Sequence, residues 1–124
     1  MSKQANQILQ VIQDSDLHMT AEEIFLKCKE LDLSVSIATV YRNLGIMTNE
    51  GIIQKVSIVG EPDRYDKCPQ VHEHLFCIKC KKVEDLNTGN LKQMLEETFN
   101  VMLESYDLSL RIICEECRKK EIAS

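Results

Sequence analysis

The segment "SIATVYRNLGIMTNE", residues 36–50, predicts an amphipathic helix that presents polar side chains on one face. Ser36 is the expected N-cap, because its side-chain oxygen can accept a hydrogen bond from the first helical turn. The apolar side chains share the other face and are Ile37, Val40, Leu44 and Met47. Arg42 points almost directly away from that apolar face, and Tyr41 lies on its flank. This polar face suits the major groove of DNA, although a packing helix with an exposed polar surface fits the same pattern.

Two more helices and a hairpin are expected around this segment. Residues 3–14 place apolar side chains at one helical face, and Thr20 with Glu23 forms a capping box that starts a second helix. Residues 52–66 are rich in β-branched side chains and are interrupted by the turn sequence GEP, as in a β-hairpin. Three helices followed by a hairpin is the order of a winged helix-turn-helix.

The second half of the chain has a different pattern. Pro69 disfavours a central strand and marks a boundary. Strands are expected at "EHLFC" and "KVEDL", followed by a helix whose apolar positions continue to Met102 and by a last strand of alternating apolar residues. The predicted fold class is therefore α+β. It comprises a winged helix-turn-helix DNA-binding domain at residues 1–65 and an α/β metal-binding dimerisation domain at residues 66–124.

Two C-x-x-C pairs in this second half supply four soft ligands. The pairs are Cys77 with Cys80 and Cys114 with Cys117. Four thiolates are the donor set of a tetrahedral structural zinc, which would clip the last strand to the first. A dithiol redox pair and an iron–sulfur cluster are the alternatives, but two matched pairs favour a metal ion.

The histidines suggest a second kind of site. His72 and His74 are two residues apart, so on a strand they point to the same face. Asp66 and Asp85 lie close by in the sequence, whereas His18 lies in the helical half. A mixed imidazole and carboxylate set suits iron(II), manganese(II) or zinc. Each of these side chains also fits an ordinary solvated surface residue.

The composition limits the remaining possibilities. The net charge of −5 argues against loose, non-specific nucleic-acid binding, which depends on Lys and Arg. No apolar run approaches the length of a membrane span, and the polar first ten residues do not resemble a signal peptide. We therefore expect a cytoplasmic protein with no membrane partner, in which cysteines serve as metal ligands or reduced thiols.

Several co-linear motifs resemble the ferric uptake regulator family over nearly the whole chain. They are "HMTAEEIF", "SVSIATVYRNLGIMTNEGIIQKV", "RYD", "HEHLFCIKCKKVEDL" and "CEEC". The resemblance implies a metal-dependent transcriptional repressor that binds palindromic double-stranded operator DNA as a homodimer. It also implies a structural zinc at the four cysteines, and neither an enzyme nor a small-molecule substrate.

Within the family, the chain is most similar to the peroxide-sensing branch. That similarity implies a regulatory Fe(II) or Mn(II) ion held by His18, Asp66, His72, His74 and Asp85. Iron-uptake repressors often carry Glu where the two aspartates stand. The implied mechanism is oxidation of His18 or His72 by iron(II) with peroxide, which releases the metal and lifts repression. An iron- or zinc-responsive repressor of metal uptake genes with the same fold is the alternative.

The resemblance also assigns the DNA contacts. Tyr41 and Arg42 are expected to face bases, and Lys55 and Arg64 on the wing are expected to meet phosphates.

Five positions depart from the family pattern. Arg42 stands where some peroxide-sensing members have Asn, which looks more like the iron-responsive branch. Ala5 replaces an arginine of the first helix, which in this chain begins late, and Cys68 is an additional thiol near the domain boundary. Val71 and Ile113 stand where an additional metal site of iron-uptake repressors has histidines, so that site is expected to be absent.

Two functions outside this family are also compatible with parts of the sequence. A zinc hydrolase is disfavoured because "HEH" lacks the H-E-x-x-H spacing. A metal-storage or adaptor protein without a DNA role is distinguished by a DNA-binding measurement.

Overall fold

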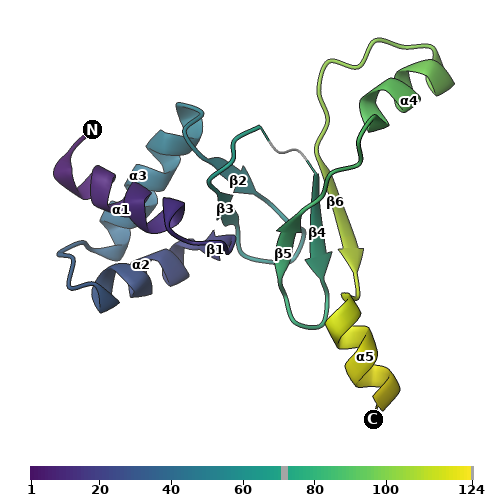
Figure 1. The fold of residues 1–124 in the computed structure, drawn as a ribbon. Helices are drawn as coiled ribbons and strands as arrows, with labels where there is room; N and C mark the ends of the chain where they lie inside the picture. Colours follow the sequence, from purple (N-terminus) through teal and green to yellow (C-terminus); the bar gives the residue numbers. More distant parts are fainter. Residues whose placement is uncertain (71–72, 124) are drawn as a thin grey trace. The chain divides into compact units, whose positions relative to one another are not determined.

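The computed structural model describes residues 1–70 and 73–123, which belong to two compact units (Figure 1). The first unit is Met1–Gln70 and the second is Val71–Ser124. The division follows Gln70 rather than Tyr65, the end of the domain expected from the sequence. The last strand of the hairpin continues to Asp66 and pairs within the first unit.

Three helices form the body of the first unit. They are α1 (Lys3–Gln13), α2 (Ala21–Glu30) and α3 (Ile37–Asn49). Each begins at a hydroxyl side chain that accepts a backbone hydrogen bond: Ser2 from Ala5, Thr20 from Glu23 and Ser36 from Thr39. The expected capping box at Thr20 is present in full, with the Glu23 carboxylate accepting the Thr20 N–H.

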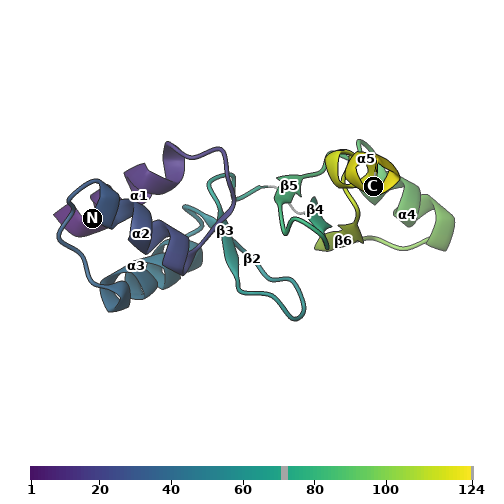
Figure 2. The same cartoon turned by 90° about the horizontal axis from the view of Figure 1, so that it is seen from below.

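A small antiparallel sheet completes this unit. Its strands are β1 (Met19–Thr20), β2 (Gln54–Val56) and β3 (Arg64–Asp66), in the order β1-β3-β2. The loop joining β2 and β3 extends away from the helices as a wing (Figure 2). The strand β1 is not indicated by the sequence pattern, because two residues are too few to show alternation. The unit is therefore a winged helix-turn-helix.

The three helices pack around one apolar core. It includes Ile8, Ile24, Val40, Leu44 and Met47, none of them more than 1% exposed. Cys28 is also fully buried in this core, as expected of a small apolar side chain.

One expectation for the third helix was wrong. Ile37 was placed on the apolar face but is 36% exposed, while Asn43 is buried. Asn43 tolerates burial because its side-chain amide donates to the Thr39 carbonyl oxygen at 2.9 Å.

The second unit contains a three-stranded sheet of order β5-β4-β6. Its strands are β4 (Glu73–Cys77), β5 (Val83–Asp85) and β6 (Leu108–Ile112). The central strand β4 is antiparallel to β5 and parallel to β6. A parallel pair needs a crossover connection, and the chain makes it through α4 (Leu91–Phe99).

The second unit corrects two expectations. The helix ends at Phe99, because Asn100 adopts a left-handed conformation with φ of 53°. Met102, which the sequence pattern placed on the helix, lies beyond that end and is 93% exposed. A further helix, α5 (Glu115–Ala123), follows β6 and has no apolar stripe that could have predicted it.

Much apolar surface of this second unit is uncovered. None of the described residues of α4 is fully buried. Exposed apolar side chains of this unit include Met94, Phe99, Val101, Met102 and Leu110. By comparison, the buried apolar side chains among the described residues of this unit are few: Phe76, Cys77 and Val83. Such a surface is typical of a chain that buries it against a partner.

Among the described residues, no helix is both long and apolar enough to cross a membrane.

Candidate metal centres and DNA-facing surface

The four cysteines of the two C-x-x-C pairs form one cluster in the second unit. Cys77 ends β4, Cys80 follows in the turn, Cys114 follows β6, and Cys117 lies in the first turn of α5. Their sulfur atoms all lie within 4.8 Å of one another. The sulfur atoms are 3.8 Å apart in the pair Cys77–Cys117 and 3.9 Å apart in the pair Cys80–Cys114.

This spacing fits a tetrahedral zinc ion. Four sulfur atoms at the usual Zn–S distance of about 2.3 Å lie about 3.8 Å from each other. A disulfide would need sulfur atoms about 2 Å apart, and all of these cysteines are free thiols. The donor set and its spacing therefore match a structural zinc site that links β4, the following turn and the start of α5.

The electrostatics of the cluster also favour a cation. The backbone N–H of Cys114 donates to the Cys77 sulfur at 3.4 Å and, together with that of Cys80, lowers the pKa of the Cys77 thiol to about 6. Hydrogen bonding to the Cys114 thiol and burial raise the pKa of Cys117 to about 12. A divalent ion bound to the four sulfur atoms would stabilise the thiolate form of each cysteine.

A histidine and a carboxylate are paired in the first unit. The Nε2 atom of His18 lies 3.2 Å from Oδ2 of Asp66. Both side chains are largely buried, with exposed fractions of 10% and 3%. The other carboxylate oxygen, Oδ1, accepts the backbone N–H of Cys68 at 2.9 Å, which fixes the orientation of the Asp66 side chain. Cys68 itself is exposed.

A second pair of the same kind lies in the second unit. His74 and Asp85 are directly opposite each other on β4 and β5, with Nε2 of the histidine 3.4 Å from Oδ1 of the aspartate. The His74 side chain is buried, whereas that of Asp85 is partly exposed. His72, the remaining candidate of the "HEH" stretch, lies outside the described residues.

Each pair has the spacing of neighbouring ligands on one ion. Nitrogen and oxygen ligands about 2.1 Å from a metal lie about 3.0–3.4 Å apart in octahedral or tetrahedral coordination. Imidazole nitrogen and carboxylate oxygen are donors that suit iron(II), manganese(II) and zinc. The residues present in each unit therefore fit a pair of neighbouring ligands in a mixed histidine–carboxylate site.

The exposed face of α3 contains the residues expected to face bases. Arg42 is exposed, as the helical spacing predicts. Tyr41 is also exposed, but its hydroxyl donates to the carboxylate of Glu22 in the first turn of α2. That hydrogen bond raises the pKa of Tyr41 and lowers the pKa of Glu22. Sequence spacing gave no sign of this contact, because the two residues lie on different helices.

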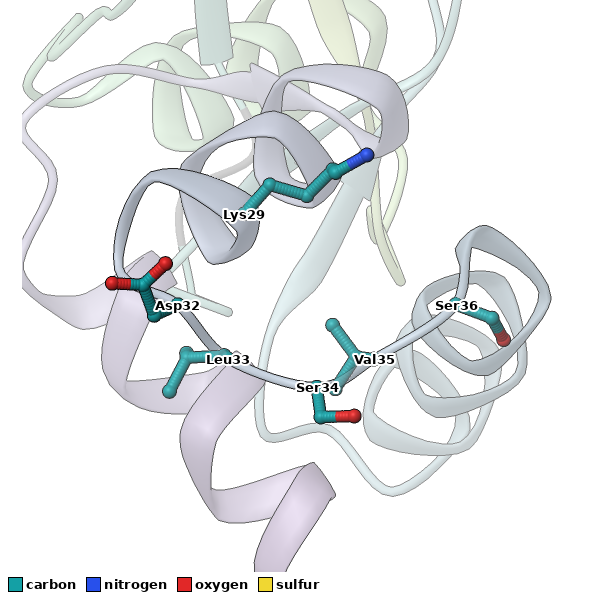
Figure 3. Close-up of a pocket in the computed structure, with 6 residues that line it drawn as sticks. All are labelled: Lys29, Asp32, Leu33, Ser34, Val35 and Ser36. Carbon is teal, nitrogen blue, oxygen red and sulfur yellow. The ribbon is translucent and has the colours of Figure 1, made fainter.

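The turn between α2 and α3 is open at the surface. It forms a pocket of about 530 Å³ lined by residues 32–36 and by Lys29 (Figure 3). Leu33 and Val35 of this turn pack against the core of the first unit.

The two wing residues differ from each other. The Lys55 side chain is exposed and is therefore accessible to a phosphate, although its Nζ atom lies 4.0 Å from Oδ2 of Asp63. Arg64 is only 17% exposed, and its Nη1 atom donates to the His18 carbonyl oxygen at 2.9 Å. The expectation that Arg64 meets phosphate does not fit this placement, because its guanidinium is already held inside the unit.

A buried carboxylate in the second unit was also missed by the sequence reasoning. Glu73, between the two histidines of "HEH", is 8% exposed. It accepts hydrogen bonds from the Thr88 backbone N–H at 2.9 Å, from the Thr88 hydroxyl at 2.7 Å and from the Tyr106 hydroxyl. No local pattern indicates this burial, because Glu73 and its neighbour His74 are both buried and the donors to Glu73 come from distant segments.

A winged-helix unit followed by an α/β unit with a four-cysteine cluster defines a class of metal-binding, DNA-binding regulators. Residues 1–111 match the model of the ferric uptake regulator family, and the chain belongs to that family. It is a metal-responsive transcriptional regulator and not an enzyme.

Characterised relatives include regulators of two kinds. The ferric uptake regulation protein of Bacillus subtilis is 25% identical over 118 residues, covering 90% of this chain and 79% of the relative. The peroxide operon regulator of the same organism is 27% identical over 124 residues, covering 98% and 86%. Among solved structures, the Helicobacter pylori ferric uptake regulator, described as having three functional metal-binding sites, superimposes with a TM-score of 0.84. It is 26% identical and covers 95% of this chain and 81% of that one.

Proposed function

We propose that the protein is a homodimeric, metal-dependent repressor in which one regulatory ion takes ligands from both units. The observation that carries this proposal is the presence of a histidine–carboxylate pair in each unit, His18–Asp66 in the first and His74–Asp85 in the second. Two ligands are few for iron(II) or manganese(II), whereas two such pairs, with His72, supply five.

The regulatory role follows from sharing the ion between units. An ion bound to both pairs restricts the motion of the DNA-binding unit relative to the rest of the dimer. Two recognition helices must stand about one DNA turn apart to read a palindrome, so such a restriction favours operator binding. Arg42 and Tyr41 on α3 would then contact bases, and Lys55 on the wing would contact phosphate.

The second unit supplies the dimer contact in this proposal. Its exposed apolar side chains on and after α4 would be buried against the second copy. The zinc ion at the four cysteines would hold β4, the turn after it and α5 together. A small unit with a thin core commonly depends on a metal and on oligomerisation for its stability.

We further propose that peroxide is the signal. The regulatory pairs contain aspartate at both carboxylate positions, which is the pattern of the peroxide-sensing branch. Iron(II), when bound, supplies the electrons that convert peroxide to an oxidant beside the ligands. His18 and His72 would hold the ion through imidazole nitrogen, and oxidation of either ring would make it a poorer donor, which would favour loss of the ion and the end of repression.

A repressor that responds to iron or zinc itself is the second candidate. It is favoured by the similar identities to the ferric uptake and peroxide regulators, 25% and 27%. The experiment that decides is operator binding by the zinc-loaded dimer with Fe(II), Mn(II) or Zn(II), each with and without peroxide. Loss of binding with Fe(II) plus peroxide, but not with Mn(II) plus peroxide, is expected. Binding that tracks one metal and ignores peroxide would favour the second candidate.

A further inference from the structure

We infer that Arg64 is a positioning residue, which fixes His18 for the regulatory metal and takes no part in phosphate contact. This inference rests on the proposed regulatory site, since metal affinity is its measured consequence.

The strand β3 holds His18 at two points. Arg64 and Asp66 are two residues apart on β3, so their side chains lie on the same face of that strand. Asp66 lies 3.2 Å from the imidazole Nε2 of His18, and Arg64 donates to the main-chain carbonyl oxygen of the same residue at 2.9 Å. One strand therefore fixes both the ring and the backbone of one proposed ligand.

The same guanidinium also reaches the start of α2. Arg64 Nη1 lies 3.4 Å from Oε1 of Glu23, the oxygen that accepts the Thr20 N–H in the capping box. Thr20 is directly opposite Arg64 in the β1–β3 ladder. Arg64 thus joins the segment that carries His18 to a helix terminus that is itself fixed.

The burial of the Arg64 side chain favours the positioning role over a phosphate contact. The Arg64 side chain is 17% exposed, and a largely buried cation is stable only where polar groups compensate for lost water. The His18 carbonyl and Glu23 provide that compensation. Turning outward to a phosphate would break both contacts and leave the His18 carbonyl without this donor.

Without the hydrogen bond from Arg64, His18 would no longer be preorganised for metal binding. A ligand whose backbone is no longer held must be ordered when the ion binds, and the cost appears as weaker affinity. Replacing a residue that orients a metal ligand typically costs about 10- to 100-fold in metal affinity.

The test is Mn(II) titration of the zinc-loaded dimer, comparing wild type with Arg64→Gln and Arg64→Lys. Arg64→Gln removes the charge and the guanidinium donors, so the affinity for Mn(II) should fall about 10- to 100-fold. Its zinc content and thermal midpoint should be unchanged. Lys keeps the charge and one donor and should recover part of that loss. If Arg64→Gln has a lower thermal midpoint, the Mn(II) affinity of Arg64→Lys is compared with that of wild type instead.

Lys55→Ala is the matched control, because Lys55 lies on the adjacent strand and is exposed. Its Mn(II) affinity should equal that of wild type.

Operator binding at saturating Mn(II) separates the two roles of Arg64. A positioning role predicts that excess Mn(II) restores wild-type operator affinity in Arg64→Gln. A phosphate contact predicts weaker binding at every Mn(II) concentration, with a shallower dependence on salt. Unchanged Mn(II) affinity in both Arg64 variants would overturn the inference alone. Failure of the wild type to bind Mn(II) in a His18-dependent way would overturn the proposed regulatory site as well.

Discussion

The hydroxyl of Tyr41 on the recognition helix donates to the carboxylate of Glu22 on the preceding helix. A residue expected to face bases is therefore held by an acidic group next to the DNA-facing surface. The hydrogen bond restricts the orientation of the phenol ring, because the hydroxyl must stay directed at the Glu22 carboxylate.

Glu22→Ala should release Tyr41 and lower its pKa. The hydrogen bond to Glu22 is the largest cause of the raised pKa of Tyr41, since the tyrosinate form loses the bond and is repelled by the carboxylate. An alkaline ultraviolet titration of the tyrosines should show ionisation at lower pH in the variant, mainly of Tyr41 and to a smaller extent of Tyr65, whose pKa Glu22 also raises. Glu30→Ala, which removes an exposed carboxylate paired with Lys27 on the same helix, should leave the curve unchanged. Identical curves for Glu22→Ala and wild type would show that the contact does not persist in solution.

Cys114→Ser should remove the zinc and unfold the second unit. Metal binding contributes directly to the folding free energy of small domains, and three thiolates hold zinc more weakly than four. Metal analysis should find about one zinc per chain in wild type and a strong reduction in the variant. Cys68→Ser is the control, because Cys68 lies outside the cluster and should leave zinc content intact. A folded, zinc-free dimer of Cys114→Ser would contradict the structural role.

Arg42→Ala should weaken operator binding without lowering the thermal midpoint, because Arg42 is exposed on α3. If Arg42 reads a guanine, the loss should be about 1–3 kcal/mol and concentrated at one base position. A competition assay with singly substituted operators measures this pattern. Lys55→Ala should instead weaken binding to all of these operators equally. Equal loss across operators for Arg42→Ala would assign it to phosphate.

His18→Ala should leave the dimer and its zinc intact but abolish metal-activated operator binding. In wild type, Fe(II) with peroxide should add one oxygen atom to the peptide that contains His18 or His72, and Mn(II) should protect both. Peptide mass spectrometry after exposure measures this directly. Oxidation confined to methionine and cysteine, with operator binding unaffected, would rule out peroxide sensing.

Thr88→Val should destabilise the second unit by about 1.5–3 kcal/mol, the usual worth of a hydrogen bond to a charged group. The substitution keeps the side-chain shape but removes the hydroxyl that donates to the buried Glu73 carboxylate. Thr88→Ser keeps that donor and should retain most of the stability. Urea unfolding of the zinc-loaded protein provides the comparison, and equal midpoints for Val and wild type would mean that Tyr106 and the backbone suffice.

Local signals predicted most of the fold. The helix starts followed from Thr20 and Ser36, whose side chains cap their own first turns. The strand β4 matched "EHLFC" from end to end, because a short apolar run that follows the Pro69 boundary is a local property. The end of α4 was missed, since the left-handed Asn100 has no strong sequence signal of its own.

The sites were only partly predictable for the same reason. The cysteine cluster is visible in the sequence because both pairs carry their own spacing. The hydrogen bond from Arg64 to the His18 carbonyl depends instead on the pairing of β1 with β3. These two segments are about 45 residues apart, and no local pattern reveals their register. The place of Arg64 on the wing therefore indicates a phosphate contact, whereas its burial arises only from this long-range strand pairing.

The parallel pairing of β4 with β6 has a consequence for folding kinetics. The two strands can form no ladder until the whole intervening segment has been synthesised and α4 has crossed over, so their contacts are non-local. Non-local pairings slow folding, and until β6 arrives the hydrogen-bonding edge of β4 is open to other chains. A zinc ion captured by Cys77 and Cys80 would act as a nucleation point, since the later arrival of Cys114 and Cys117 would bring β6 into register. Refolding of the second unit should therefore be faster, and aggregation during refolding lower, when zinc is present from the start.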